Sequence, residues 1–264
     1  FWALPQSPQI FKQLLMISGM EKYFQIARCF RDEDLRADRQ PEFTQIDIEM
    51  SFGDEETIFG TVENLMKQIF KGTKDIDLED HFQRMTWHEC MRRYGSDKPD
   101  LRFGNEIQNI SNLFEHTEFK VFKSVLEEKG EINCIKFENA GDKYSRKALD
   151  QLQDFVKHGF KAKALAYLKM SETELSGSIA KVLSEDEKQV LISSLGLKNN
   201  DLVLVIADKP SVSRSALGAL RVRLAHELNL IPEGNVYKFL WVTDFPMFEY
   251  SEEEDRYVAA HHPF

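Results

Sequence analysis

Residues 43–52 alternate between apolar and polar side chains, and this alternation constrains the fold more than any other feature of the chain. One side of the two-residue repeat holds Thr44, Ile46, Ile48, Met50 and Phe52; the other holds Phe43, Gln45, Asp47, Glu49 and Ser51. Such a repeat is typical of a half-buried β-strand. We therefore expect the apolar face to pack on the core, while Gln45, Asp47 and Glu49 form a row on the other face.

Another strand is predicted just before this one, because residues 23–31 are rich in β-forming side chains. The charged loop between the two strands contains Asp34, Arg36, Asp38 and Arg39. The same repeat places on one face Gln25, Cys29, Arg31 and Glu33. Paired antiparallel, the two strands would present a polar patch, in which arginine suits two-point capture of a carboxylate or a phosphate. The alternative is an ordinary solvated hairpin whose charges pair with one another.

The composition indicates a globular protein of one large domain or two ordinary ones, with 264 residues of which 42% are hydrophobic. The net charge of −10 argues against broad, nonspecific nucleic-acid binding, and so against DNA as a partner. Cys29, Cys90 and Cys134 are widely spaced and fit no metal-ligand pattern, so we expect reduced thiols and no metal site. No apolar run approaches the ~20 residues of a membrane span, and no signal peptide is recognisable. We expect a cytoplasmic protein without a membrane partner.

Several helices are predicted from their end signals. Ser7 and Pro8 predict the start of a helix that ends at Gly19. This helix has an apolar stripe, and Gln9 and Lys12 lie outside it. Taken alone, Lys12 is most simply a surface lysine. Asp54 is expected to cap an amphipathic core helix over residues 54–71, and Thr86 to cap a short helix that stops at Gly95. Residues 96–102 predict a loop.

Between about residues 104 and 236, short helices and strands alternate. Helices are predicted over 121–129, 145–158 with Gly159 as its stop, 184–194 and 211–228, and strands over 132–137, 163–169 and 202–207. Four basic residues of this region, Lys181, Arg214, Arg221 and Arg223, are interpreted as solvated side chains; the alternative is contact with RNA. Residues 239–250 predict a strand with an edge or a bulge at Pro246, and 256–260 another strand leading to His261 and His262.

A resemblance extends over most of the chain. FRDE followed by R-x-x-R-Q-P-E-F-T-Q-x-D-x-E resembles motif 2 of class II aminoacyl-tRNA synthetases, and RDEDLRADRQPEFTQID resembles the bacterial aspartyl-tRNA synthetase family. Further segments resemble that family in the same order: ALPQSPQIFKQLLM, RRYGSDKPDLR, ALGALR, WVTDFPMFEY and HHPF. The resemblance implies an α+β fold, an antiparallel sheet flanked by helices. It would comprise core residues 1–103, an inserted GAD-type α+β domain at 104–236, and returning core strands at 237–264.

The resemblance also implies an activity and a site. The enzyme would activate L-aspartate with ATP and transfer it to tRNA(Asp), with Arg31 as the catalytic residue clamping the α-phosphate. The residues implied for aspartate binding are Gln9, Lys12, Arg31, Gln45, Asp47, His261 and His262. Those implied for ATP are Arg31, Asp32, Glu33, Gln40 and Phe43, and those near the tRNA acceptor end are Arg36, Asp38 and Arg39. Lys12 would pair with the aspartate side chain, and Mg²⁺ ligands are expected outside this segment.

Parts of the family pattern are missing from these residues. Family members carry an anticodon-binding OB domain, a motif 1 used in dimerisation and a motif 3 with an ATP-binding arginine. The chain also starts without Met. We therefore expect the central segment of a longer, homodimeric enzyme, inactive by itself. The alternatives are a non-catalytic, synthetase-like tRNA-binding or regulatory protein and, more weakly, an amidotransferase subunit that shares only the inserted module. Whether asparagine tRNA is also charged stays open.

Overall fold

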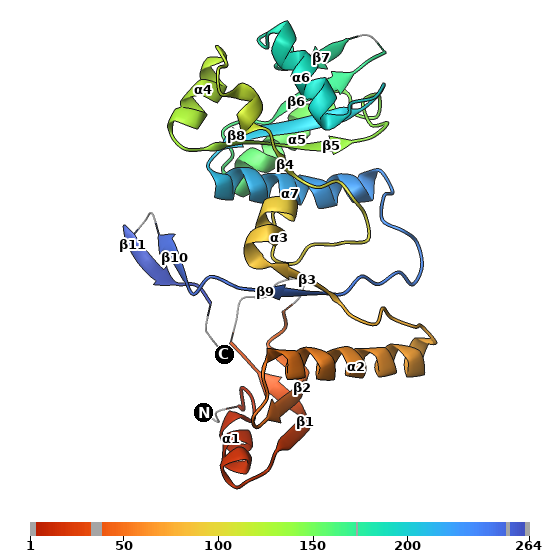
Figure 1. The fold of residues 1–264 in the computed structure, drawn as a ribbon, viewed down its shortest axis with the longest axis vertical. Helices are drawn as coiled ribbons and strands as arrows, with labels where there is room; N and C mark the ends of the chain where they lie inside the picture. Colours follow the sequence, from red (N-terminus) through yellow and green to blue (C-terminus); the bar gives the residue numbers. More distant parts are fainter. Residues whose placement is uncertain (1–3, 33–38, 173, 252–253, 262–264) are drawn as a thin grey trace. The chain divides into compact units, whose positions relative to one another are not determined.

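The computed structural model describes residues 4–32, 39–172, 174–251 and 254–261. The chain divides into two compact units, Phe1–His81 and Phe82–Phe264, each with its own helices and strands (Figure 1). The predicted α+β class is confirmed, with mixed helices and mostly antiparallel sheets. Among the described residues, no helix combines the length and the apolar character needed to span a bilayer.

The first unit is built on the predicted hairpin. It contains α1 (Gln9–Ile17), β1 (Lys22–Phe30), β2 (Glu42–Met50) and α2 (Glu55–Lys74). The two strands pair antiparallel, with Gln25 opposite Asp47 and Cys29 opposite Phe43. Because side chains alternate along each strand, these four residues share one face, as the sequence predicted.

The two hairpin faces are buried in the opposite way to the prediction, with the apolar face exposed and part of the polar face buried. Phe24, Ile26 and Ile46, on the apolar face, are 74%, 69% and 52% exposed, whereas Asp47 on the polar face is buried. The prediction that the apolar face packs on the core is therefore wrong for the described residues. The reason is that α1 packs against the polar face through Lys12, and α2 reaches only part of the apolar face.

Helix α1 also differs from its prediction. It begins at Gln9 after Pro8, with no side-chain cap, so the predicted N-cap role of Ser7 is wrong. Its apolar residues Ile10 and Phe11 are exposed, while Lys12 is 8% exposed. Lys12 is thus the buried side chain of the helix, and its interpretation as a plain surface lysine is wrong.

Helix α2 begins as predicted, because the Asp54 side chain accepts a hydrogen bond from the Thr57 backbone N–H. It extends to Lys74, with Asp75 in the left-handed conformation as its C-cap. The predicted core stripe is at best half-buried in the described structure, and Ile58 is 40% exposed. Its fully buried residue is instead Glu63, whose carboxylate lies 3.2 Å from His81 Nδ1.

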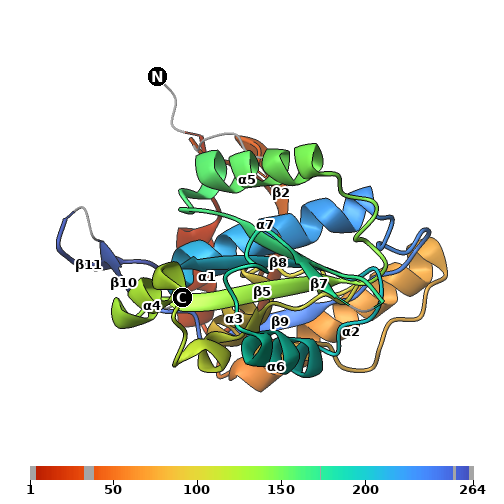
Figure 2. The same ribbon diagram turned by 90° about the horizontal axis from the view of Figure 1, so that it is seen from above.

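The second unit contains a five-stranded antiparallel sheet in the order β4-β5-β8-β6-β7. Its strands are β4 (Gln108–Asn109), β5 (Glu131–Phe137), β6 (Ala166–Met170), β7 (Leu175–Gly177) and β8 (Leu202–Asp208). Its helices are η1 (Ser111–Phe114), α4 (Lys120–Glu127), α5 (Arg146–Phe160), α6 (Glu185–Leu195) and α7 (Pro210–Glu227). Figure 2 shows α5 and α7 on one side of the sheet and α6 on the other.

Alternation along the central strands builds two cores. On β5, Ile135 and Phe137 pack with α5 and α7, while Ile132 and Cys134 pack with η1, α4 and α6. Because both sheet faces are covered, β8 is a nearly continuous apolar run, whereas β5 also contains Glu131, Asn133 and Lys136. The two layers explain why these strands were recognisable from sequence.

Beside this sheet, β3 (Gln83–Thr86) pairs in parallel with β9 (Leu240–Thr243), and α3 (Trp87–Tyr94) follows β3. Thr86 caps α3 and Gly95 ends it, as predicted. These elements belong to the same compact unit as residues 104–236. The proposed domain boundaries after residues 103 and 236 stay a prediction.

Two predicted boundaries in this unit are wrong. Helix α5 continues past Gly159 to Phe160, and Lys161 takes the left-handed C-cap conformation at φ 58°. The single strand predicted over 239–250 is broken after β9, where Asp244 has φ 56°. It resumes as β10 (Phe248–Ser251), which pairs antiparallel with β11 (Arg256–Ala259).

Arg221 of α7 is the largest departure from the predicted solvated helix faces, because it is 1% exposed. Its guanidinium donates hydrogen bonds to the backbone carbonyls of Asp100, Phe103, Gly104 and Asn105. It also lies 4.0 Å from the ring centroid of Phe103. The side chain therefore satisfies carbonyls of a loop more than a hundred residues earlier.

Candidate active site

A buried ion pair joins α1 to β2. Lys12 Nζ lies 2.7 Å from Asp47 Oδ1 and 3.4 Å from Glu49 Oε2. Lys12 and Asp47 are both 8% exposed, and Glu49 is half-buried. Burial by itself would lower the pKa of Lys12, but the hydrogen bonds and charges of the two carboxylates outweigh it and raise that pKa above its ordinary value. The ammonium group is therefore a fixed, permanent cation on the hairpin's polar face.

Gln45 lies on the same face, two residues before Asp47. Its Oε1 accepts a hydrogen bond from the Cys29 thiol across the hairpin, at 3.2 Å. Cys29 is fully buried, and Gln45 is half-buried. The structure thus brings together three predicted aspartate-binding residues, Lys12, Gln45 and Asp47. Gln9, another of these predicted residues, is exposed at the first position of α1, one helical turn before Lys12.

Arg31 continues the same face just beyond the end of β1. Its guanidinium lies over the ring of Phe43, 5.2 Å from the centroid. Its backbone N–H donates to the Pro41 carbonyl at 2.9 Å, which keeps the two chain segments paired past the last residue of β1. Arg31 is exposed, so its cationic head can reach a ligand from solvent.

The other described residues predicted to bind nucleotide or RNA lie nearby in the chain. Gln40 and Phe43 line one open pocket of 570 Å³ together with Arg28, Glu42 and Thr44. Asp32 and Arg39 are exposed at the two ends of the loop. Glu33, Arg36 and Asp38 fall outside the described residues, as does His262.

His261 belongs to the second unit. It is exposed, and its ring makes an edge contact with Phe245, with centroids 4.8 Å apart. Its expected role over the aspartate stays a prediction.

Sequence reasoning did not assign two residues that the geometry adds to this site. Glu49 was placed on the polar face without a role, yet it is the second carboxylate beside Lys12. Cys29 was placed on the same face and treated only as a reduced thiol, yet it contacts Gln45. The two-residue repeat gave the face of each residue, but it carried no information on contacts with α1 or across the hairpin.

The face combines cations with acceptors that suit a zwitterion. Lys12 and Arg31 can take carboxylate or phosphate oxygens, while Asp47 can accept from an ammonium group. Within the described residues, no group of three or more His, Cys, Asp or Glu side chains is arranged to hold a metal ion. The two carboxylates of the face are instead paired with Lys12.

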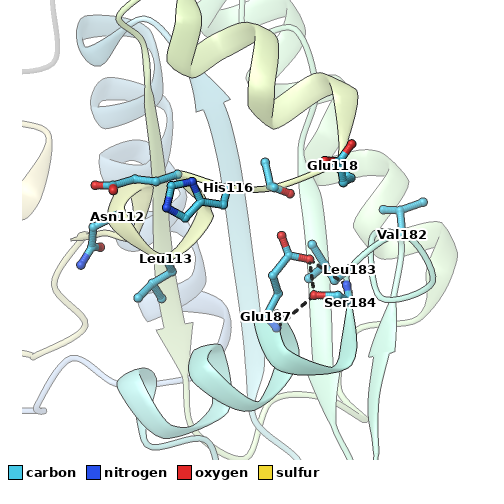
Figure 3. Close-up of a pocket in the computed structure, with 10 residues that line it drawn as sticks. Asn112, Leu113, His116, Glu118, Val182, Leu183, Ser184 and Glu187 are labelled. Carbon is cyan, nitrogen blue, oxygen red and sulfur yellow. Dashed lines mark hydrogen bonds between the residues drawn. The ribbon is translucent and has the colours of Figure 1, made fainter.

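A pocket of 490 Å³ lies in the second unit, and Figure 3 shows the side chains around it, including His116, Glu118 and Glu187. Burial would raise the pKa of Glu187, but hydrogen bonds from Thr117 and Ser184 outweigh it and leave that pKa below its usual value. Glu187 closes the capping box of α6 with Ser184. The carboxylate therefore has a structural role, and no predicted site residue lines this pocket.

The whole chain, residues 1–264, matches the family described as tRNA synthetases class II (D, K and N), so it belongs to that family.

The chain is 54% identical over its full length to an aspartate–tRNA ligase of Staphylococcus carnosus and covers 45% of that protein. It is 52% identical, again over its full length, to an aspartate–tRNA(Asp/Asn) ligase of Anoxybacillus flavithermus, of which it covers 44%. The chain therefore spans less than half the length of these relatives.

Proposed function

We propose that this chain supplies part of the catalytic domain of an aspartate–tRNA ligase. The observation that carries the proposal is the buried Lys12, held by Asp47 on the same hairpin face as Arg31. A fixed cation beside a carboxylate suits an amino acid that carries a second, side-chain carboxylate. The high identity to aspartate–tRNA ligases over all 264 residues supports the same choice.

The proposed reaction has two steps. An oxygen of the aspartate α-carboxylate attacks the α-phosphorus of ATP, the bond to the β-phosphate oxygen breaks, and pyrophosphate leaves. A hydroxyl of the terminal ribose of tRNA(Asp) then attacks the activated carbonyl, and AMP leaves with the bonding electrons. Orientation and charge stabilisation carry most of the rate in such displacements. The described residues do not form a cluster that would hold Mg²⁺, and its ligands are expected outside this segment.

Substrate selection follows from the charges around Lys12. An ammonium group has three N–H donors. Asp47 and Glu49 can accept hydrogen bonds from two of them, and in this proposal the third donates to the side-chain carboxylate of the substrate aspartate. One cation between two carboxylates leaves a local charge of about −1, so a second cation is needed to attract an anionic substrate. Arg31 supplies it at the α-carboxylate, and His261 and His262 are proposed to add hydrogen bonds.

Nucleotide binding is proposed at the loop end of the hairpin. Adenine would stack on Phe43, taking the place of the Arg31 guanidinium and freeing it to pair with the α-phosphate. Glu33 would accept from the adenine amino group, Arg39 and Gln40 would lie near the outer phosphates, and Asp32 is proposed as a further ATP contact. The 570 Å³ pocket shared by Gln40 and Phe43 supports this location.

The remaining assignments are also part of the proposal. Arg36, Asp38 and Arg39 would approach the tRNA acceptor end, and residues 104–236 would form a GAD-type insertion. The intact protein would act as a homodimer in the cytoplasm.

Aminoacylation by the intact gene product tests the proposal. Purified protein, ATP, radiolabelled aspartate and tRNA(Asp) should give acid-precipitable aspartyl-tRNA, and tRNA stripped of its terminal adenosine should give none. A protein that binds tRNA(Asp) but never charges it would contradict the proposal and favour the non-catalytic alternative.

A further inference from the structure

The contact between Cys29 and Gln45 crosses the hairpin diagonally. Gln45 stands directly opposite Ala27, and Cys29 opposite Phe43. Because Ala27 has the smallest side chain that still carries a Cβ, the Gln45 side chain has room to lean along the face toward Cys29. The fully buried Cys29 thiol then donates to Gln45 Oε1 at 3.2 Å, which is nearer than its other acceptor, the Ala27 carbonyl at 3.7 Å.

This contact fixes which way the Gln45 amide faces. A carboxamide has one oxygen that accepts and one NH₂ group that donates, and it can rotate to present either. With Oε1 accepting from the thiol, the NH₂ group remains the part of the amide that can donate to another acceptor. A rotated amide would bring its NH₂ group to the thiol sulfur, which is only a weak acceptor.

We propose that Cys29 is a positioning residue for aspartate binding, acting through Gln45. Resting on the proposed function, this inference assigns Gln45 to the α-carboxylate of the substrate, because the polar group that the thiol leaves available is the NH₂ donor. The ammonium group is left to Asp47, which can only accept. A rotated amide would present its oxygen to the carboxylate, and the two would repel.

Kinetics of aspartate-dependent ATP–pyrophosphate exchange in the intact protein test the inference. Cys29→Ala removes the donor and should raise the KM for aspartate about three- to tenfold, the usual effect of one hydrogen bond, with the KM for ATP unchanged. Cys29→Ser keeps a donor at nearly the same place and should restore the parental KM. Cys134→Ala, an equally buried cysteine in the sheet of the second unit, is the matched control and should leave both constants unchanged.

A double-mutant cycle separates positioning from general destabilisation. In a Gln45→Ala background, Cys29→Ala should have no further effect on the KM for aspartate, because its only route to the substrate is gone. Melting temperatures of all variants are recorded alongside. Equal KM values for parent and Cys29→Ala, or additive effects in the cycle, would overturn this inference alone. Absence of exchange in the parent would overturn the proposed function and this inference together.

Discussion

Lys12 and Asp47 form a buried ion pair between α1 and β2, with Nζ 2.7 Å from Oδ1 and 35 residues between them in the chain. The two side chains are 10% and 8% exposed. Leaving a buried cation without a carboxylate partner is costly, typically about 3–5 kcal/mol. A substrate with a neutral amide would leave Lys12 paired with Asp47 and Glu49, and would lose only its own charge-assisted hydrogen bond to the ammonium group, worth about 1.5–3 kcal/mol. That difference makes Lys12 the candidate specificity determinant.

Substitution of Lys12 should therefore change amino-acid selection. Lys12→Met should reduce the preference for aspartate over asparagine by about ten- to a hundredfold in ATP–pyrophosphate exchange, because the neutral side chain no longer favours a carboxylate. Lys22→Met, an exposed lysine at the start of β1, is the control and should keep the parental preference. An unchanged preference in Lys12→Met would remove Lys12 from the specificity site.

Arg31 should be required for adenylate formation. Arg31→Ala should lower kcat/KM for exchange about 10²- to 10³-fold, the usual loss when one stabilising donor is removed from a transition state. Arg146→Ala tests the loss of a positive charge alone, because Arg146 is an exposed residue at the start of α5 in the second unit. Equal losses in the two variants would show that the position of Arg31 has no special role.

The alternation of residues 43–52 predicted the strand, its antiparallel partner and the shared face of Gln25, Arg31, Gln45 and Asp47. These features are local, so a two-residue period is enough to specify them. What covers each face is not local. The burial of Lys12 depends on carboxylates 35 and 37 residues away, and the sequence pattern assigned it to the surface.

The same limit applies to Arg221. Its position on α7 was recognisable, but its carbonyl partners lie in a loop at residues 100–105. Helix ends were predicted best where a side chain caps the backbone, as at Asp54, Thr86 and Ser184. Gly159 was a misleading stop signal, because Lys161 adopts the left-handed conformation in its place.

Arg221 should be a large contributor to the stability of the second unit. Arg221→Met should lower its free energy of unfolding by about 3–5 kcal/mol, because several loop carbonyls lose their donor in a buried site. Arg223→Met, two residues later, removes a partly exposed pair with Glu227 and should cost less than about 1 kcal/mol. Urea denaturation compares them, and similar costs would contradict the structural role assigned to Arg221.

The crossing of α3 and α7 should tolerate no side chain at Gly95. A Cβ there would lie 2.0 Å from the Arg214 carbonyl oxygen, and φ is +65°. Gly95→Ala should therefore destabilise the protein by more than about 2 kcal/mol. Gly72→Ala in α2 meets nothing within 4 Å and should stabilise it by about 0.5–1 kcal/mol. Thermal melts measure both, and a neutral Gly95→Ala would refute the close approach.

The buried Cys134 thiol should make the protein sensitive to alkali. Burial raises its pKa from 9.0 to about 12 in the folded state. Between these values the unfolded thiol loses its proton while the folded one keeps it, so stability falls as pH rises, by up to about 1.4 kcal/mol per pH unit. In this window, Cys134→Ala should make the fall of unfolding free energy with pH less steep. The difference in slope should correspond to nearly one proton released on unfolding. An identical slope in the variant would contradict the raised pKa.

The most direct test of the account is the choice among the three amino acids of this synthetase group, aspartate, lysine and asparagine, in ATP–pyrophosphate exchange by the intact protein. A hairpin face that holds a buried ammonium beside a carboxylate should support exchange with aspartate at least about a hundredfold better than with asparagine, and should give none with lysine. Comparable exchange with asparagine, or any preference for lysine, would contradict it.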